Sequence, residues 1–175
     1  MILRLKRTPG IYLVGFMATG KSTVGRLLAD ELGWYFVDLD EQIEQAAGSS
    51  ISQVFETQGE AAFRQMEHER LADVVRKVEY GKPHVVALGG GAFAQDNNYQ
   101  LLENNGVTIW LDCPLEVLER RVARAQHRPL ARDLERFRSL YQTRREAYSK
   151  ADYRIEVGDA DATVHVQSIM KLPLF

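Results

Sequence analysis

The chain has 175 residues, 45% hydrophobic and 26% charged, which suits one folded domain and excludes the disordered, collagen-like and disulfide-rich classes. A single cysteine excludes an internal disulfide, and no apolar run long enough for a signal peptide or membrane helix follows the basic N-terminus, so we expect a cytoplasmic protein. The net charge of −2 conceals a basic block over residues 119–154, where eleven Lys and Arg stand against five Asp and Glu. Such a block inside an otherwise acidic chain indicates a site for an anion.

Along the chain, apolar runs of strand length alternate five times with stretches of helical period. This alternation predicts an α/β fold with a parallel sheet that helices cover on both faces. No linker or internal repeat divides the sequence, so we expect one domain over residues 1–175. The predicted strands are 11–14, 34–37, 85–88, 107–111 and 153–157, and the predicted helices are 21–32, 41–47, one from 50, 59–78, 97–103, one from 114, one ending near 150 and one from 161.

The first strand leads into residues 15–22, GFMATGKS, which match the phosphate-loop pattern G-x-x-x-x-G-K-[ST] at every defined position. A strand precedes the pattern and a helix follows it, as this loop requires. Backbone N–H groups would surround phosphate oxygens, Lys21 would reach the β- and γ-phosphates, and the Ser22 hydroxyl would bind Mg²⁺. The alternative is a glycine-rich turn that only joins a strand to a helix.

Two carboxylates follow the second strand. Asp38 and Asp40 are two residues apart, and in an extended chain this spacing directs both side chains the same way, with Leu39 opposite. One carboxylate near Mg²⁺ and one facing an acceptor hydroxyl would suit phosphoryl transfer. The alternative is that Asp40 caps the next helix and Asp38 is solvated.

Two arginines occupy apolar helix faces. Arg144 shares a stripe with Tyr141, and Arg64 lies on the apolar face of its own predicted helix. An arginine that faces inward needs an anion, and its planar guanidinium fits a carboxylate bidentately. The alternatives are a side chain that extends to water and, for Arg64, an internal salt bridge to Glu60 or Glu67.

Two further segments are weaker candidates. The triplet 89–91, GGG, ends the third strand and permits close approach of the backbone to a small polar ligand, although it could equally be a turn. Residues 127–130, HRPL, lie between two predicted helices and could form the tip of a mobile lid that carries a cation, or a solvated loop. The four histidines and Cys113 lack the spacing of metal ligands, so we assign them structural or surface places.

Taken together, these segments resemble the shikimate kinase family of small P-loop kinases, in the family's order and over most of the chain. The resemblance implies a three-layer αβα fold with a five-stranded parallel sheet, a substrate-binding segment at about 40–70 and a mobile lid at about 124–134. It also implies transfer of the γ-phosphoryl group of ATP to the 3-hydroxyl of shikimate with Mg²⁺. The segments that carry it are 15–23 (GFMATGKST), 36–40 (FVDLD), 55–67 (FETQGEAAFRQME), 87–92 (ALGGGA), 128–130 (RPL) and 144–148 (RREAY).

The resemblance implies a role for each matching residue. It assigns catalysis to Lys21, Asp40 and Arg128, and magnesium to Ser22 and Asp38. It also implies shikimate as the small-molecule partner, without nucleic acid or membrane, and a monomer. The implied ATP-binding residues are Ala18, Thr19, Gly20, Lys21, Ser22, Thr23, Arg124 and Arg128, with Arg124 against the adenine; the implied shikimate-binding residues are Asp40, Arg64, Gly89, Gly90, Gly91 and Arg144.

The chain departs from the family pattern in four places. Ala18 stands where a further loop glycine is common, the lid segment 124–128 is short, Ala131 and not a second leucine follows Leu130, and no Arg or Pro occurs near 158–163 to frame the adenine. The alternative functions are a kinase for another small hydroxylated acid, such as gluconate, and a non-catalytic metabolite-binding module on the same fold. Nucleic-acid binding through the basic block is disfavoured, because no aromatic residues are interleaved as a stacking platform.

Overall fold

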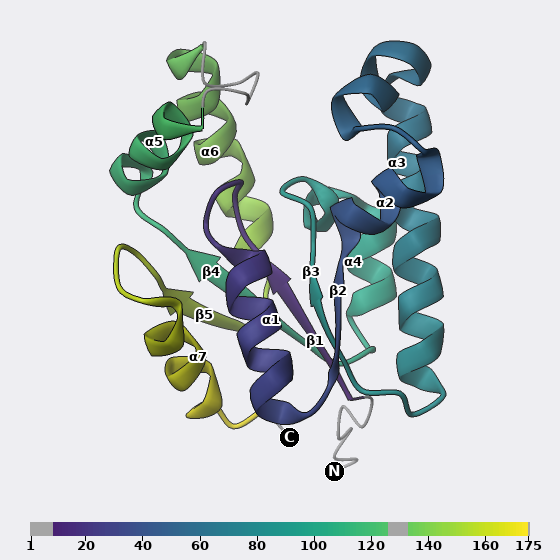
Figure 1. Ribbon diagram of the computed structural model, residues 1–175, viewed down its shortest axis with the longest axis vertical. Coiled ribbons are helices and arrows are strands. Elements are labelled where there is room, and N and C mark those ends of the chain that lie inside the picture. Colours follow the sequence, from purple (N-terminus) through teal and green to yellow (C-terminus); the bar gives the residue numbers. More distant parts are fainter. Residues whose placement is uncertain (1–8, 126–132, 175) are drawn as a thin grey trace.

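The structure, a computed structural model, describes residues 9–125 and 133–174 (Figure 1). Its five strands form one sheet in the order β2-β3-β1-β4-β5, and every neighbouring pair is parallel. The predicted five-stranded parallel sheet is therefore confirmed. The strands are β1 (Gly10–Val14), β2 (Tyr35–Asp38), β3 (His84–Ala87), β4 (Val107–Asp112) and β5 (Tyr153–Glu156).

Helices lie on both faces of the sheet. In Figure 1, α1 and α7 lie in front of the strands and α4 lies behind them, which gives the three layers expected of the fold. No helix in the described part of the chain is long and apolar enough to cross a membrane. The helices are α1 (Lys21–Leu32), α2 (Leu39–Ala47), α3 (Ile51–Glu79), the 3₁₀ turn η1 (Ala92–Ala94), α4 (Asp96–Leu102), α5 (Leu115–Arg124), α6 (Leu134–Tyr148) and α7 (Ala162–Met170).

The central strands are buried along their whole length. Every residue of β1, β3 and β4 is buried, as expected for strands with helices on both faces. Most of their side chains belong to one continuous apolar cluster that also includes residues of α1, α3, α5, α6 and α7. This rigid sheet fixes the positions of the loops that leave its carboxyl ends.

Helix α3 agrees with the prediction of two successive helices. The sequence indicated one helix from residue 50 and another over 59–78, and α3 consists of two helical parts that meet at a non-helical kink at Gly59. Gly59 has φ 85° and ψ 172°, a conformation that only glycine adopts readily. The helix starts with the predicted capping box, in which Ser50 and Gln53 exchange side chain–backbone hydrogen bonds.

The carboxyl ends of the strands all point to one end of the molecule, where α/β sheets bind their ligands. There, α2 and the first part of α3 rise on one side, and α5 with the first part of α6 on the other (Figure 1). The phosphate loop follows β1, Asp38 ends β2, and residues 89–91 follow β3. Segments far apart in the sequence are thus brought to one site.

Candidate active site

The loop between β1 and α1 has the closed shape of a phosphate cradle. Gly20, directly before α1, has φ 95°, and Ala18 has φ 64°, the only positive φ of a non-glycine residue in the described chain. The Lys21 ammonium group donates to the carbonyl oxygens of Gly15 at 2.7 Å and Phe16 at 2.9 Å. Lys21 therefore folds back over its own loop, where the outer phosphates of a nucleotide would lie.

Ser22 and Asp38 meet beside this loop. The Ser22 hydroxyl donates a hydrogen bond to Asp38 Oδ2, and both residues line a cavity of about 610 Å³ together with the loop. Among the described residues, no cluster of three or more His, Cys, Asp or Glu is placed to hold a metal ion by itself. A hydroxyl and a carboxylate are, however, the oxygen donors that Mg²⁺ takes alongside phosphates, so this pair fits a magnesium ion bound with a nucleotide.

The extended geometry predicted for Asp38 and Asp40 is wrong. Helix α2 begins at Leu39, so only Asp38 belongs to the strand. Asp38 Oδ1 accepts hydrogen bonds from the backbone N–H groups of Asp40 at 3.0 Å and Glu41 at 3.2 Å, so Asp38, not Asp40, caps the helix. The cap turns the chain at the end of the strand, and Asp40 still enters the site from the first turn of α2.

Arg121 lines the cavity beside the phosphate loop. Its guanidinium donates to the carbonyl oxygens of Ala18 at 2.8 Å and Gly158 at 2.7 Å, and so joins the phosphate loop to the segment after β5. Arg124, the residue predicted to lie against adenine, is exposed and is not among the described residues that line this cavity. The predicted Arg128 lies outside the described residues, as does the whole predicted lid tip 127–130.

A second cavity of about 500 Å³ lies next to the first and has a different character. Apolar side chains from the two rising sides form its walls: Ile51 and Phe55 from the start of α3, Phe63 beyond the kink, and Leu140 from α6. The rest of its lining is mostly charged side chains and the glycine triplet, and consists of Met17, Asp40, Ser52, Glu56, Arg64, Glu67, Gly89, Gly90, Gly91 and Arg144. A cavity of this size with a few convergent polar groups suits a small polar ring.

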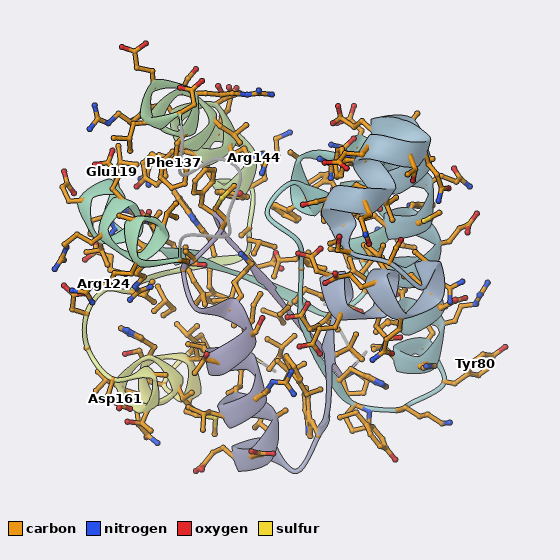
Figure 2. The ribbon with its side chains drawn as sticks, turned by 45° about the horizontal axis from the view of Figure 1, so that its top comes forward. Tyr80, Glu119, Arg124, Phe137, Arg144 and Asp161 are labelled. Atoms are coloured by element: carbon orange, nitrogen blue, oxygen red, sulfur yellow. The ribbon has the colours of Figure 1, made fainter. Side chains whose placement is uncertain are left out.

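Both predicted inward-facing arginines line this second cavity. Arg64 forms a salt bridge of 2.8 Å with Glu67 and a longer one of 3.6 Å with Glu60, so the predicted internal pairing exists alongside the cavity position. Arg144 lies on the side of α6 that faces α2 and α3 (Figure 2). Its guanidinium interacts with the Tyr148 hydroxyl, and no carboxylate in the described chain forms an ion pair with it.

The glycine triplet is packed directly against the charged groups. A Cβ atom on Gly89 would lie 2.6 Å from Asp40 Oδ1, and one on Gly91 would lie 2.6 Å from Arg64 Nη2 and 3.0 Å from Arg144 Nη2. None of these glycines has a positive φ. Glycine lets the charged groups pack directly on the backbone, because an added side chain at Gly89 or Gly91 would displace them, as the sequence prediction of close approach anticipated.

Asp40 lies where the two cavities meet. Only Met17, Asp40 and Gly90 line both cavities within the described chain. Burial raises the pKa of the Asp40 carboxyl, an effect that nearby Lys21 opposes. A carboxylate with a raised pKa binds a proton more readily than an exposed one, which favours proton transfer from a hydroxyl group held at this junction.

Glu67 is a site residue that sequence reasoning treated only as an alternative partner of Arg64. Its side chain is 1% exposed, and Oε1 accepts from Arg64 at 2.8 Å while Oε2 has no hydrogen-bond partner. Burial raises its pKa, against the opposing effect of the Arg64 charge. Its position three residues after Arg64, one turn along the same helix, was the available signal.

Comparisons with known proteins agree on one family. The family described as shikimate kinase matches residues 17–172. A shikimate kinase from Caulobacter vibrioides is 41% identical over 167 residues, which cover 94% of this chain and 82% of that protein. The solved shikimate kinase from Acinetobacter baumannii, in complex with shikimate, is 36% identical, with a TM-score of 0.86 over 95% of this chain and 93% of that one.

The fold is shared more widely than the family. A shikimate kinase from Aquifex aeolicus superposes with a TM-score of 0.81 at 39% identity, over 92% of this chain and 94% of that one. A gluconokinase from Sinorhizobium meliloti gives a TM-score of only 0.57 at 22% identity, over 92% and 89% of the two chains. The likeness to the gluconokinase is one of fold alone.

Proposed function

The chain belongs to the shikimate kinase family, and from this premise we propose how its two adjoining cavities transfer the γ-phosphoryl group of ATP to the 3-hydroxyl of shikimate. The cavity beside the phosphate loop takes ATP, and the cavity lined by Arg64 and Arg144 takes shikimate. The whole chain then forms a single kinase domain.

The ATP phosphates bind in the loop of residues 15–23. The N–H groups at the start of α1 and the ammonium group of Lys21 face the phosphate oxygens, with the positive end of the helix dipole behind them. Lys21 leaves its contacts with the Gly15 and Phe16 carbonyls for the phosphates. Ser22 and Asp38 hold Mg²⁺, which when bound neutralises charge on the phosphates.

The nucleoside end of ATP lies against Arg121. Its two hydrogen bonds to backbone carbonyls hold the guanidinium plane fixed at the wall of the cavity, where a flat base can stack on it. This placement replaces Arg124 as the adenine residue. Arg128 keeps its predicted role as the lid cation that approaches the transferring phosphoryl group.

Shikimate binds with its carboxylate between Arg64 and Arg144 and its ring against the apolar wall. Arg144 supplies a cation that forms no ion pair with a carboxylate of the described residues. Arg64 forms a salt bridge with the buried Glu67. A bidentate bond to either guanidinium fixes the orientation of the ring. The 3-hydroxyl, two ring carbons away from the carbon that bears the carboxylate, then faces Asp40 and the nucleotide.

The chemical step is an in-line displacement at the γ-phosphorus. The 3-hydroxyl oxygen forms a bond to phosphorus, the bond from phosphorus to the β–γ bridging oxygen breaks, and ADP leaves with that electron pair. The hydroxyl proton passes to the Asp40 carboxylate, whose pKa burial raises. Lys21 stabilises the charge that develops on the phosphoryl oxygens.

One observation carries this proposal: Asp40 lines both the cavity with the phosphate loop and the cavity with the two arginines. A group at that junction can contact the acceptor hydroxyl and the phosphoryl donor at once. We also propose a monomeric enzyme of the reducing cytoplasm, in keeping with a single Cys113 that is free and buried.

A coupled assay of ADP release tests the function. The purified protein is given ATP and Mg²⁺ with shikimate, gluconate or a nucleoside monophosphate, and a parallel reaction omits the acceptor. We expect ADP release to depend on shikimate and the product to carry phosphate on the 3-oxygen. Stimulation by gluconate or a nucleotide but not by shikimate would refute the assignment, and no stimulation by any acceptor would support the non-catalytic alternative.

A further inference from the structure

We propose that Tyr148 is a positioning residue for shikimate binding, which acts by holding the guanidinium of Arg144 against the Gly90 backbone. The inference rests on the proposed carboxylate-binding role of Arg144. Tyr148 itself is not among the described residues that line the shikimate cavity. It would therefore affect substrate binding through Arg144 rather than by contact.

Tyr148 is the last residue of α6, one turn beyond Arg144, so the two side chains lie on the same face of the helix. The tyrosine is 1% exposed, and its ring lies 6.0 Å from that of Trp110. Its hydroxyl donates a hydrogen bond to the carbonyl oxygen of Gly90, and the Arg144 side chain interacts with the same hydroxyl. The hydroxyl thus joins α6 to the loop after β3.

The atoms present decide which group donates at the Tyr148 hydroxyl, both toward Gly90 and toward Arg144. A tyrosine hydroxyl has one hydrogen to donate and lone pairs to accept with, a carbonyl oxygen only accepts, and a guanidinium only donates. The hydrogen must go to Gly90, and Arg144 must donate to the phenolic oxygen. Burial raises the pKa of Tyr148 to about 12, so the hydroxyl keeps the hydrogen that this arrangement requires at neutral pH.

The interaction of Arg144 with the Tyr148 hydroxyl limits where the Arg144 guanidinium can lie. A Cβ atom on Gly90 would be 3.2 Å from Arg144 Nη1, and one on Gly91 would be 3.0 Å from Nη2. The guanidinium therefore lies flat against this loop, held by the tyrosine on one side. With one guanidinium edge fixed, the remaining N–H groups keep a constant direction toward the cavity, which lowers the entropy lost when a carboxylate binds.

Tyr141 provides a matched control on the same helix. It is also buried, at 7% exposure, and its hydroxyl also donates to a backbone carbonyl, that of Cys113 at 2.9 Å. Its second partner is Arg145, which pairs with Asp112, and it is not among the described residues that line the shikimate cavity. Tyr141→Phe removes an equivalent hydroxyl from α6 without touching Arg144.

The experiment measures KM for shikimate and for ATP in Tyr148→Phe and Tyr141→Phe, with thermal unfolding of each variant. For Tyr148→Phe we expect KM for shikimate to rise roughly three- to ten-fold, the effect of losing one hydrogen bond that orients the guanidinium, with KM for ATP within about twofold. Tyr141→Phe should leave both KM values within about twofold, although it loses comparable stability. Equal effects of the two variants on KM for shikimate would overturn the proposal.

The double variant Arg144→Ala with Tyr148→Phe separates this inference from the proposed function. If Tyr148 acts through Arg144, adding Tyr148→Phe to Arg144→Ala changes KM for shikimate by less than about twofold. Multiplication of the two single effects would show that Tyr148 acts independently and would refute the inference. If Arg144→Ala alone leaves KM for shikimate unchanged, the carboxylate-binding role itself fails, which is a different result.

Discussion

Replacement of Gly91 by alanine is the most specific perturbation that the shikimate cavity offers. Gly91 has φ −104° and ψ −5°, a conformation open to alanine, so the backbone accepts the change. The added Cβ atom would lie 2.6 Å from Arg64 Nη2 and 3.0 Å from Arg144 Nη2. The substitution therefore acts on the two guanidinium groups proposed to bind the carboxylate.

The size of the effect follows from these distances. Ordinary van der Waals contact begins at 3.4 Å, so Arg64 Nη2 must move by about 0.8 Å and Arg144 Nη2 by about 0.4 Å. Displacements of this size break the geometry of a bidentate bond, and a lost hydrogen bond to a charged group is worth roughly 1.5–3 kcal/mol. We therefore expect KM for shikimate to rise roughly 10- to 100-fold in Gly91→Ala.

Steady-state kinetics with ATP and shikimate varied in turn provide the assay. KM for ATP should stay within about twofold and the free energy of unfolding within about 1 kcal/mol, because both displaced groups are ends of flexible side chains. Gly89→Ala is the comparison, since its Cβ would lie 2.6 Å from Asp40 Oδ1, and it should lower kcat more than it raises KM. An unchanged KM for shikimate in folded Gly91→Ala would refute the placement of the carboxylate.

Two further substitutions test Asp40 and the kink of α3. Because burial raises the folded-state pKa of Asp40, its ionisation disfavours the folded state increasingly as pH rises past the ordinary aspartate range. Asp40→Asn should therefore melt at a higher temperature than the wild type at pH 7, with a smaller difference at pH 4. Its turnover should fall by roughly 100-fold or more. A lower melting temperature than the wild type at pH 7 would contradict the burial argument. Gly59→Ala should lower the free energy of unfolding by roughly 1–3 kcal/mol in denaturant titrations, because φ 85° with ψ 172° strains any residue with a side chain. An unchanged free energy of unfolding would mean that the kink relaxes.

The parts of the site that depend on local sequence were predictable. The phosphate loop is a continuous pattern between a strand and a helix, and the structure has the strand, the turn and the helix at the expected residues. The apolar stripe that placed Arg144 toward the interior is a property of one helix. Both arguments need only the periodicity of a single element.

The parts that failed depend on contacts between elements or on cap geometry. Asp38 and Asp40 were placed on an extended chain with the next helix expected from residue 41, but the capping bonds of Asp38 start α2 at Leu39, two residues earlier. Arg121 was missed because its two carbonyl partners, Ala18 and Gly158, are 103 and 37 residues away along the chain. Hydrogen bonds between residues so far apart produce no periodic pattern in the sequence.

The most direct test of the central claim, that Arg64 and Arg144 bind the carboxylate of shikimate, compares shikimate with its uncharged methyl ester in equilibrium binding. The wild type should prefer the acid by roughly 100-fold, the value of charge-assisted hydrogen bonds to the carboxylate. In Arg144→Ala that preference should fall to below about tenfold, while affinity for the ester changes little. Equal preference for the acid in the wild type and in Arg144→Ala would contradict the account.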